Sequence, residues 1–147
     1  MEQTLRERAL RLLARREHTR AELMRKLKPY AESAEALDAL LDDLKARRLL
    51  SDERYVEMRL GARAARFGNA RLAHELRTQG VADDLVSAAL AATEDELDRA
   101  REVWRRKFAG KAPEDAAERA RQARFLAGRG FSGETVRRVL RGAFEDD

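Results

Sequence analysis

The sequence predicts an all-α protein, organised as a tandem array of three three-helix repeats with about nine helices. The 147 residues are rich in Ala, Leu, Arg and Glu, which lose little entropy in a helix, and they include only two prolines. No segment shows the period-two alternation of β-branched residues that is typical of strands. Apolar residues instead recur at helical spacing, and their framework recurs again after about 50 positions.

The repeat is clearest between the middle and the end of the chain. Residues 76–81 align with residues 126–131, fifty positions later. The match continues without a gap through three aligned apolar pairs: Val86 with Val136, Ala89 with Val139 and Leu90 with Leu140. Forty-nine positions earlier, Leu27 takes the place of Leu76. Each repeat would bury its apolar face against its neighbour. The predicted domains are helical repeats at residues 1–50, 51–92 and 93–147.

Start and stop signals place the helices of the first two repeats. In the first repeat we expect helices at residues 5–16, 20–28 and 34–47. The second of these opens on a capping box, in which the Thr19 hydroxyl and the Glu22 carboxylate accept free backbone N–H groups. In the second repeat we expect helices at residues 53–67, 70–79 and 84–92. Asp52 is a candidate N-cap, and Gly80 suits a left-handed stop after the middle helix.

The third repeat shows the same kinds of signal, with helices expected at residues 94–108, 114–128 and 133–144. A second capping box, Thr93 to Glu96, opens the first of them. Trp104 lies on the apolar face of that helix and is expected in the core. The remaining signals are Pro113 in a first turn, Gly130 as a stop and Ser132 as an N-cap.

Several classes of chemistry are missing from the sequence. The chain has no cysteine, which excludes disulfides, thiolate metal sites and thiol nucleophiles. His18 and His74 stand alone, without the spacing of a metal site, so we expect surface or capping roles for both. Two pairs of adjacent carboxylates point to different sides of a helix and cannot converge as acid and base: Asp42-Asp43 and Asp83-Asp84. The prediction is a non-enzyme with no cofactor and no metal.

The N-terminal segment and the apolar runs indicate the compartment. The first 20 residues are charged throughout and lack the apolar centre of a signal peptide. No segment approaches the roughly 20 apolar residues that span a bilayer. We therefore expect a cytoplasmic protein with no membrane contact.

Charge alternates along the chain in step with the repeat. The net charge is +4, and five successive segments carry +5, −4, +4, −5 and +4: residues 1–30, 31–53, 54–81, 82–100 and 101–147. At helical phase, basic residues flank the apolar stripe of first and second helices, whereas acids gather on third helices. This predicts a basic strip opposite an acidic side, suited to phosphates or to an acidic protein groove. Its candidate residues are Arg20, Arg25, Lys26, Tyr55, Arg59, Arg63, Arg66, Arg71 and Arg77.

Two alternatives stay open at this point. The same charges fit an ordinary solvated helix surface with ion pairs between successive turns. The ring of Tyr55 could pack against Arg59 between helices, or it could be presented to a partner.

Four segments, in chain order, resemble the signatures of the RecX family. Residues 9–23 resemble its opening signature, and residues 49–55 resemble the junction before its second repeat. Residues 68–80 are similar to its central segment between two glycines, and residues 124–132 to its C-terminal signature. Together they span nearly the whole chain. Asn69-Ala70 departs from the family pattern, which has proline or a basic residue there.

The resemblance implies an elongated, curved array that docks along the groove of a RecA filament on DNA. RecX relatives restrain recombinase and ATPase activity there, by capping filament growth or by promoting disassembly. The chain would then modulate RecA, mainly as an inhibitor, in homologous recombination, DNA repair and the SOS response. We expect a monomer, with at most weak binding to single- or double-stranded DNA.

Two other functions are alternatives. One is a direct nucleic-acid-binding protein that uses helices 20–28 and 34–47 as a helix-turn-helix. Its second helix would be acidic, and an acidic helix is a poor reader of the major groove. The other is a general helical scaffold with a different partner.

Overall fold

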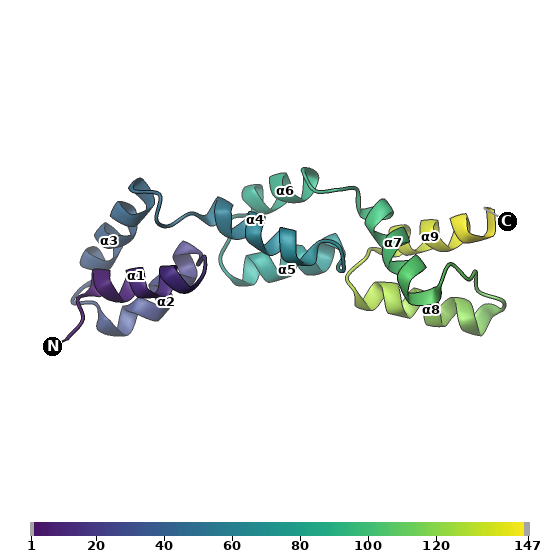
Figure 1. The fold of residues 1–147 in the computed structure, drawn as a ribbon, viewed down its shortest axis with the longest axis horizontal. Coiled ribbons are helices and arrows are strands. Elements are labelled where there is room, and N and C mark those ends of the chain that lie inside the picture. Colours follow the sequence, from purple (N-terminus) through teal and green to yellow (C-terminus); the bar gives the residue numbers. More distant parts are fainter. Residues whose placement is uncertain (1, 146–147) are drawn as a thin grey trace. The chain divides into compact units, whose positions relative to one another are not determined.

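The computed structural model describes residues 2–145 and confirms the all-α fold (Figure 1). The described chain contains nine α-helices, with a short 3₁₀ turn η1 (Lys28–Tyr30) after the second, and no strand. The helices are α1 (Leu5–Arg15), α2 (Arg20–Leu27), α3 (Ala34–Ala46), α4 (Asp52–Arg63), α5 (Asn69–Thr78), α6 (Asp83–Ala91), α7 (Glu96–Phe108), α8 (Ala116–Gly128) and α9 (Gly133–Glu145).

Several start and stop signals are confirmed. The Thr19 hydroxyl accepts the backbone N–H of Glu22 at 3.0 Å, and the Ser132 hydroxyl accepts that of Thr135 at 3.2 Å. The Glu22 carboxylate accepts from Arg16 instead, so only the hydroxyl half of this capping box is confirmed. Gly80 and Gly130 have φ angles of 83° and 91°, in the left-handed region that favours glycine.

Three of the predicted signals for helix starts differ from the structure. α4 is capped by Ser51, whose hydroxyl accepts the N–H of Arg54, whereas Asp52 is the first helical residue. α7 is capped by Asp95, because the Thr93 hydroxyl donates back to the carbonyl of Ala89 in α6. α8 begins at Ala116 with Asp115 as its cap, so Pro113 lies before the first turn.

The largest difference between the predicted and the observed helices is the end of α4. The helix was expected to run to residue 67, but it ends at Arg63. The carbonyls of Ala64 and Phe67 accept hydrogen bonds from the Arg99 guanidinium, at 2.9 and 2.8 Å. The carbonyls at this helix end are therefore satisfied by an arginine 32 positions beyond Phe67, and no local sequence pattern predicts that contact.

The described chain divides into two compact units. The first runs to Arg59 and also takes in Leu76–Val86; the second takes in Leu60–Glu75 and everything described from Ser87 onward. The first unit holds a leucine-rich core between α1, α2 and α3. The second holds a core between α7, α8 and α9 that includes Trp104, as predicted, with its indole N–H donating to Gln122 at 2.7 Å. The repeat boundaries at residues 50 and 92 and the elongated, curved shape stay predictions.

In each unit, the start of one helix packs against a glycine turn further along the chain, and we call this contact a joint. In the first unit, the Thr19 hydroxyl donates to the carbonyl of Gln79 at 2.6 Å. The N–H of Arg20 donates to the Asp52 carboxylate at 2.8 Å. A side chain on Gly80 would fall on the β-carbon of Ala21, so the backbone approaches closely there.

The second unit repeats this joint about 50 residues later. The N–H of Gly68 donates to the carbonyl of Arg129 at 2.8 Å, and that of Asn69 donates to the Glu96 carboxylate at 2.7 Å. A side chain on Gly130 would fall on Arg71, which is the counterpart of Ala21 fifty positions earlier. The sequence repeat is thus a repeat of packing geometry as well.

Candidate partner-binding surface

The basic residues of α2 are partly neutralised by the protein itself. The Arg20 guanidinium lies 2.8 Å from Asp42 and 4.0 Å from Asp38, both on α3. In the same unit, Arg77 pairs with Asp83 at 2.9 Å. The prediction that these bases and acids lie on opposite sides is therefore wrong. Pairs within this unit bring the two signs into contact, which supports the ion-paired interpretation for these residues.

A buried histidine stands behind the exposed Lys26. His18 is only 1% exposed, so the expected surface role is wrong, whereas its contact with the carbonyl of Arg16, the C-cap residue of α1, agrees with the capping role. Its Nδ1 lies 3.0 Å from the carbonyl of Arg16 and must donate the hydrogen, because a carbonyl only accepts. Nε2 is then the acceptor for the Lys26 ammonium at 3.0 Å. Burial lowers the pKa of His18 and favours this neutral form.

Glu22 connects this histidine network to Arg16. Its carboxylate receives two hydrogen bonds from the Arg16 guanidinium, at 2.6 and 3.1 Å, and Lys26 lies 3.8 Å away. Burial acts to raise the pKa of Glu22, but the hydrogen bonds from Arg16 and the nearby positive charges outweigh it and leave the pKa lowered. Lys26 therefore belongs in part to an internal network, while Arg25 is exposed and only reaches Gln79 at 3.4 Å.

Two predicted residues of α4 face inward. Tyr55 is 4% exposed, which corrects its assignment to an exposed strip and favours packing over presentation to a partner. Arg59 is half-buried, and no acceptor in the described part of the chain pairs with its buried Nε.

In the second unit, four arginines gather around the ring of Phe67. The guanidinium carbons of Arg71 and Arg63 lie 4.2 and 4.3 Å from the ring centroid, and those of Arg129 and Arg66 lie 5.3 and 5.4 Å away. The ring is 8% exposed. Cations over a ring face are attracted by its quadrupole, so Phe67 organises arginines from three separate segments.

These arginines differ in how far they are available. Arg63 donates two hydrogen bonds to Glu75, at 2.8 and 2.6 Å, and its side chain is only 20% exposed. Arg71 lies 3.6 Å from the same carboxylate and reaches the carbonyl of Gly128. Arg66 is exposed, and its ring contact is with Phe67. Of the three predicted residues here, Arg66 is the most accessible to a partner.

Arg99 is an important residue that the sequence did not single out. It is 3% exposed and donates to the carbonyls of Glu94, Ala64 and Phe67 and to the side chain of Asn69. Burial lowers its pKa, while neighbouring acids act in the opposite direction. The residue is structural, because its donors are taken up by the protein.

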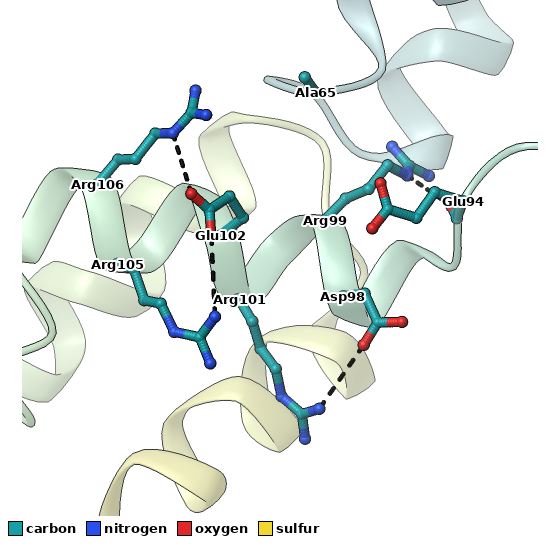
Figure 2. A pocket seen from close by; sticks show the side chains of 8 residues that line it. All are labelled: Ala65, Glu94, Asp98, Arg99, Arg101, Glu102, Arg105 and Arg106. Carbon is teal, nitrogen blue, oxygen red and sulfur yellow. Dashed lines mark hydrogen bonds and ion pairs between the residues drawn. The ribbon is translucent and has the colours of Figure 1, made fainter.

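Two open pockets border α7 in this unit. The larger, of about 530 Å³, is lined by three acids and four arginines, with Ala65 at its edge (Figure 2). Figure 2 shows Arg105 and Arg106 reaching Glu102 and Arg101 reaching Asp98, so its charges are largely paired internally. The smaller has no acid in its lining and is called the Phe125 pocket below. It is lined by Ala65, Arg66, Val103, Arg106, Lys107, Phe125 and Arg129.

No group of three or more His, Asp or Glu side chains among the described residues could hold a metal ion. None of the described helices is long and apolar enough to cross a membrane.

Comparisons with known proteins agree along the whole chain. Models of the first, second and third three-helix domains of RecX match residues 6–44, 51–90 and 94–140. The regulatory protein RecX of Leptothrix cholodnii is 53% identical over 94% of this chain and 88% of its own length. That of Chromobacterium violaceum is 48% identical over 98% and 93%. The crystal structure of RecX from Lactobacillus salivarius shares the fold, with a TM-score of 0.79, 17% identity and coverage of 95% and 94%. The chain therefore belongs to the RecX family of regulatory proteins.

Proposed function

We propose that this protein modulates the RecA recombinase, mainly as an inhibitor, by binding along the groove of the RecA–DNA filament. It would thereby regulate homologous recombination, DNA repair and the SOS response, as a non-catalytic cytoplasmic monomer. The observation that carries the proposal is the match of three RecX domains, in order, over nearly the whole chain. A modulator of this kind needs a surface for a partner and no catalytic group.

Within the predicted strip we propose a narrower contact surface, supported by the exposure of its residues. The residues best placed to meet acidic side chains or phosphates are the exposed ones: Arg25, Lys26, Arg66, Arg71 and Arg77. Arg63 is held by Glu75, Arg20 by Asp42, and Tyr55 is buried, so these three contribute mainly to packing. Exposed guanidinium groups can pair bidentately with carboxylate or phosphate.

Direct sequence-specific DNA binding has less support. The candidate recognition helix, α3, exposes Asp38 and Asp42 beside Arg20. Carboxylates there would repel the phosphate backbone. We expect weak DNA binding at most, with a strong dependence on salt.

The test is ATP hydrolysis by the cognate RecA on single-stranded DNA, with this protein titrated in below one molecule per recombinase monomer. Strong inhibition at such ratios is expected for action on the filament. No inhibition at excess would refute the proposal.

Variants then test the surface. Arg25→Ala with Arg77→Ala removes two exposed guanidinium groups and should shift the inhibition curve to about tenfold higher concentration, a loss of ~1.4 kcal/mol in binding. The matched control is Arg137→Ala with Arg138→Ala, which removes two exposed arginines from α9. Equal curves for the two double variants would refute this contact surface while leaving the function itself standing.

A further inference from the structure

The Phe125 pocket has not been assigned a role by the predicted strip or by the proposed function. Its volume is about 250 Å³. Pockets that enclose small organic ligands usually hold about 300–1,000 Å³. This one has room for a single side chain of a partner and is bounded by apolar groups from three segments: Ala65 after α4, Val103 on α7 and Phe125 on α8.

Four cations surround this apolar space, and three of them are not neutralised. Arg106 pairs with Glu102 at 3.2 Å. Arg66, Lys107 and Arg129 make ring contacts instead: Arg66 with Phe67, and Lys107 and Arg129 with Phe125 at 5.2 and 5.1 Å. Within the part of the chain that the structure describes, no carboxylate lies within ion-pair distance of these three. The pocket is therefore an apolar space under an excess of positive charge.

We propose that the Phe125 pocket binds an acidic peptide segment of a protein partner. One aliphatic side chain of that segment, such as leucine, enters the apolar space between Val103 and Phe125. Carboxylates on the flanking residues pair with Arg66, Lys107 and Arg129. Burial of the aliphatic group supplies affinity, and the surrounding cations set the sign of the partner and the orientation of its chain.

The state of the Phe125 ring favours a peptide over single-stranded nucleic acid. Proteins that bind single strands without sequence preference stack bases on open aromatic faces. Here two cations of the protein already lie over the Phe125 ring, which also forms a T-shaped pair with Phe108 at a centroid distance of 5.5 Å. The rest of the apolar lining is aliphatic. The inference does not depend on the proposed function, because any protein with such a segment could occupy the pocket.

The probe is a fluorescent synthetic peptide with one leucine flanked on each side by two acidic residues. Its control has serine in place of the leucine and the same charge. Binding to the full chain is followed by fluorescence anisotropy at about 0.1 M salt, where the Debye length is ~10 Å. We expect the leucine peptide to bind about tenfold more tightly than the serine peptide. The double variant Arg66→Ala with Lys107→Ala should lose about tenfold in affinity, whereas Arg137→Ala with Arg138→Ala should retain it.

Three results would overturn the inference. Equal affinity for the leucine and serine peptides would show an unspecific cationic surface. Equal loss in the two double variants would place binding elsewhere on the chain. Displacement of the peptide by oligothymidylate of equal charge, with tighter binding of the oligonucleotide, would identify a nucleic-acid site. Circular dichroism of each variant checks that its helices are intact. No recombinase is present, so this result is independent of the ATPase titration.

Discussion

Replacement of Arg99 by methionine should destabilise the second unit strongly, because this side chain is only 3% exposed and makes its hydrogen bonds within the protein. Arg99→Met keeps a long side chain for packing but removes every donor of the guanidinium. The carbonyls of Ala64 and Phe67 then lose their hydrogen bonds at the end of α4. The carbonyl of Glu94 and the side chain of Asn69 lose theirs as well.

The magnitude follows from the two carbonyls at the helix end. A buried polar group left without a partner costs ~1–3 kcal/mol, so two cost about 2–6 kcal/mol. Removal of the charge offsets part of this, because burial of Arg99 disfavours its charged form and lowers its pKa. We expect a net loss of about 2–4 kcal/mol. For a chain of this size, that lowers Tm by roughly 4–16 °C.

Thermal unfolding monitored by circular dichroism measures the effect, with Arg105→Met as the matched control. Arg105 lies on the same helix, is 62% exposed and has one distant partner, Glu102 at 3.8 Å. Its replacement should change stability by at most about 0.5 kcal/mol. If the two variants melt within about 2 °C of each other, the Arg99 hydrogen bonds do not hold the end of α4 and the reasoning fails.

Three further predictions concern single positions. Gly68→Ala places a β-carbon on the carbonyl of Gly130, so the free energy of unfolding in a urea titration should fall by about 1–3 kcal/mol or more. The control Gly61→Ala has open space around it inside α4 and should be neutral or stabilising by ~0.5–1 kcal/mol. Similar losses for both variants would contradict the close approach at Gly68. Gln122→Leu removes the acceptor of the Trp104 indole N–H and should lower the free energy of unfolding by about 1–3 kcal/mol. Unfolding can be monitored by the fluorescence of Trp104, the single tryptophan, and unchanged stability would mean that this buried hydrogen bond is not needed. The pKa of His18 is lowered by burial, so the unfolded chain binds its proton more readily; the stability it contributes is present above about pH 6.5 and is lost as the pH falls through the folded pKa. His18→Gln should flatten the decline in the free energy of unfolding as the pH falls below about 6.5, and an unchanged slope would point to other groups.

Much of the fold could be predicted because it depends on local signals. Helix propensity, apolar spacing and the fifty-residue recurrence gave nine helices with ends mostly within two residues. Gly80 and Gly130 could be placed because the left-handed backbone they adopt favours one residue type. The end of α4 could not, because the Arg99 guanidinium that satisfies its carbonyls comes from 32 or more positions further along the chain.

The candidate surface was predicted less well than the fold. Helical phase identifies which residues leave the core, but it does not say which charges cancel across neighbouring helices. Arg63 and Glu75 are 12 positions apart, and their pairing depends on how α4 packs on α5. The Phe125 pocket was missed because it combines segments after α4, on α7 and at the end of α8. The net charge of +4 over residues 101–147 indicates an excess of cations in this segment, but it does not indicate that Arg106, Lys107 and Arg129 meet around one pocket.

The two joints have a consequence for the length of the protein. In both joints the carbonyl before a glycine accepts a hydrogen bond and a carboxylate accepts a backbone N–H. The acceptors are Gln79 and Asp52 in the first joint, and Arg129 and Glu96 in the second. Excision of residues 81–130 would leave Gly80 followed by Phe131, with the first joint complete. The apolar residues of α9 would then stand at the positions of those in α6, Val136 for Val86 and Leu140 for Leu90. A loss of the fifty residues 81–130 would therefore keep in the chain all the residues that form the first joint.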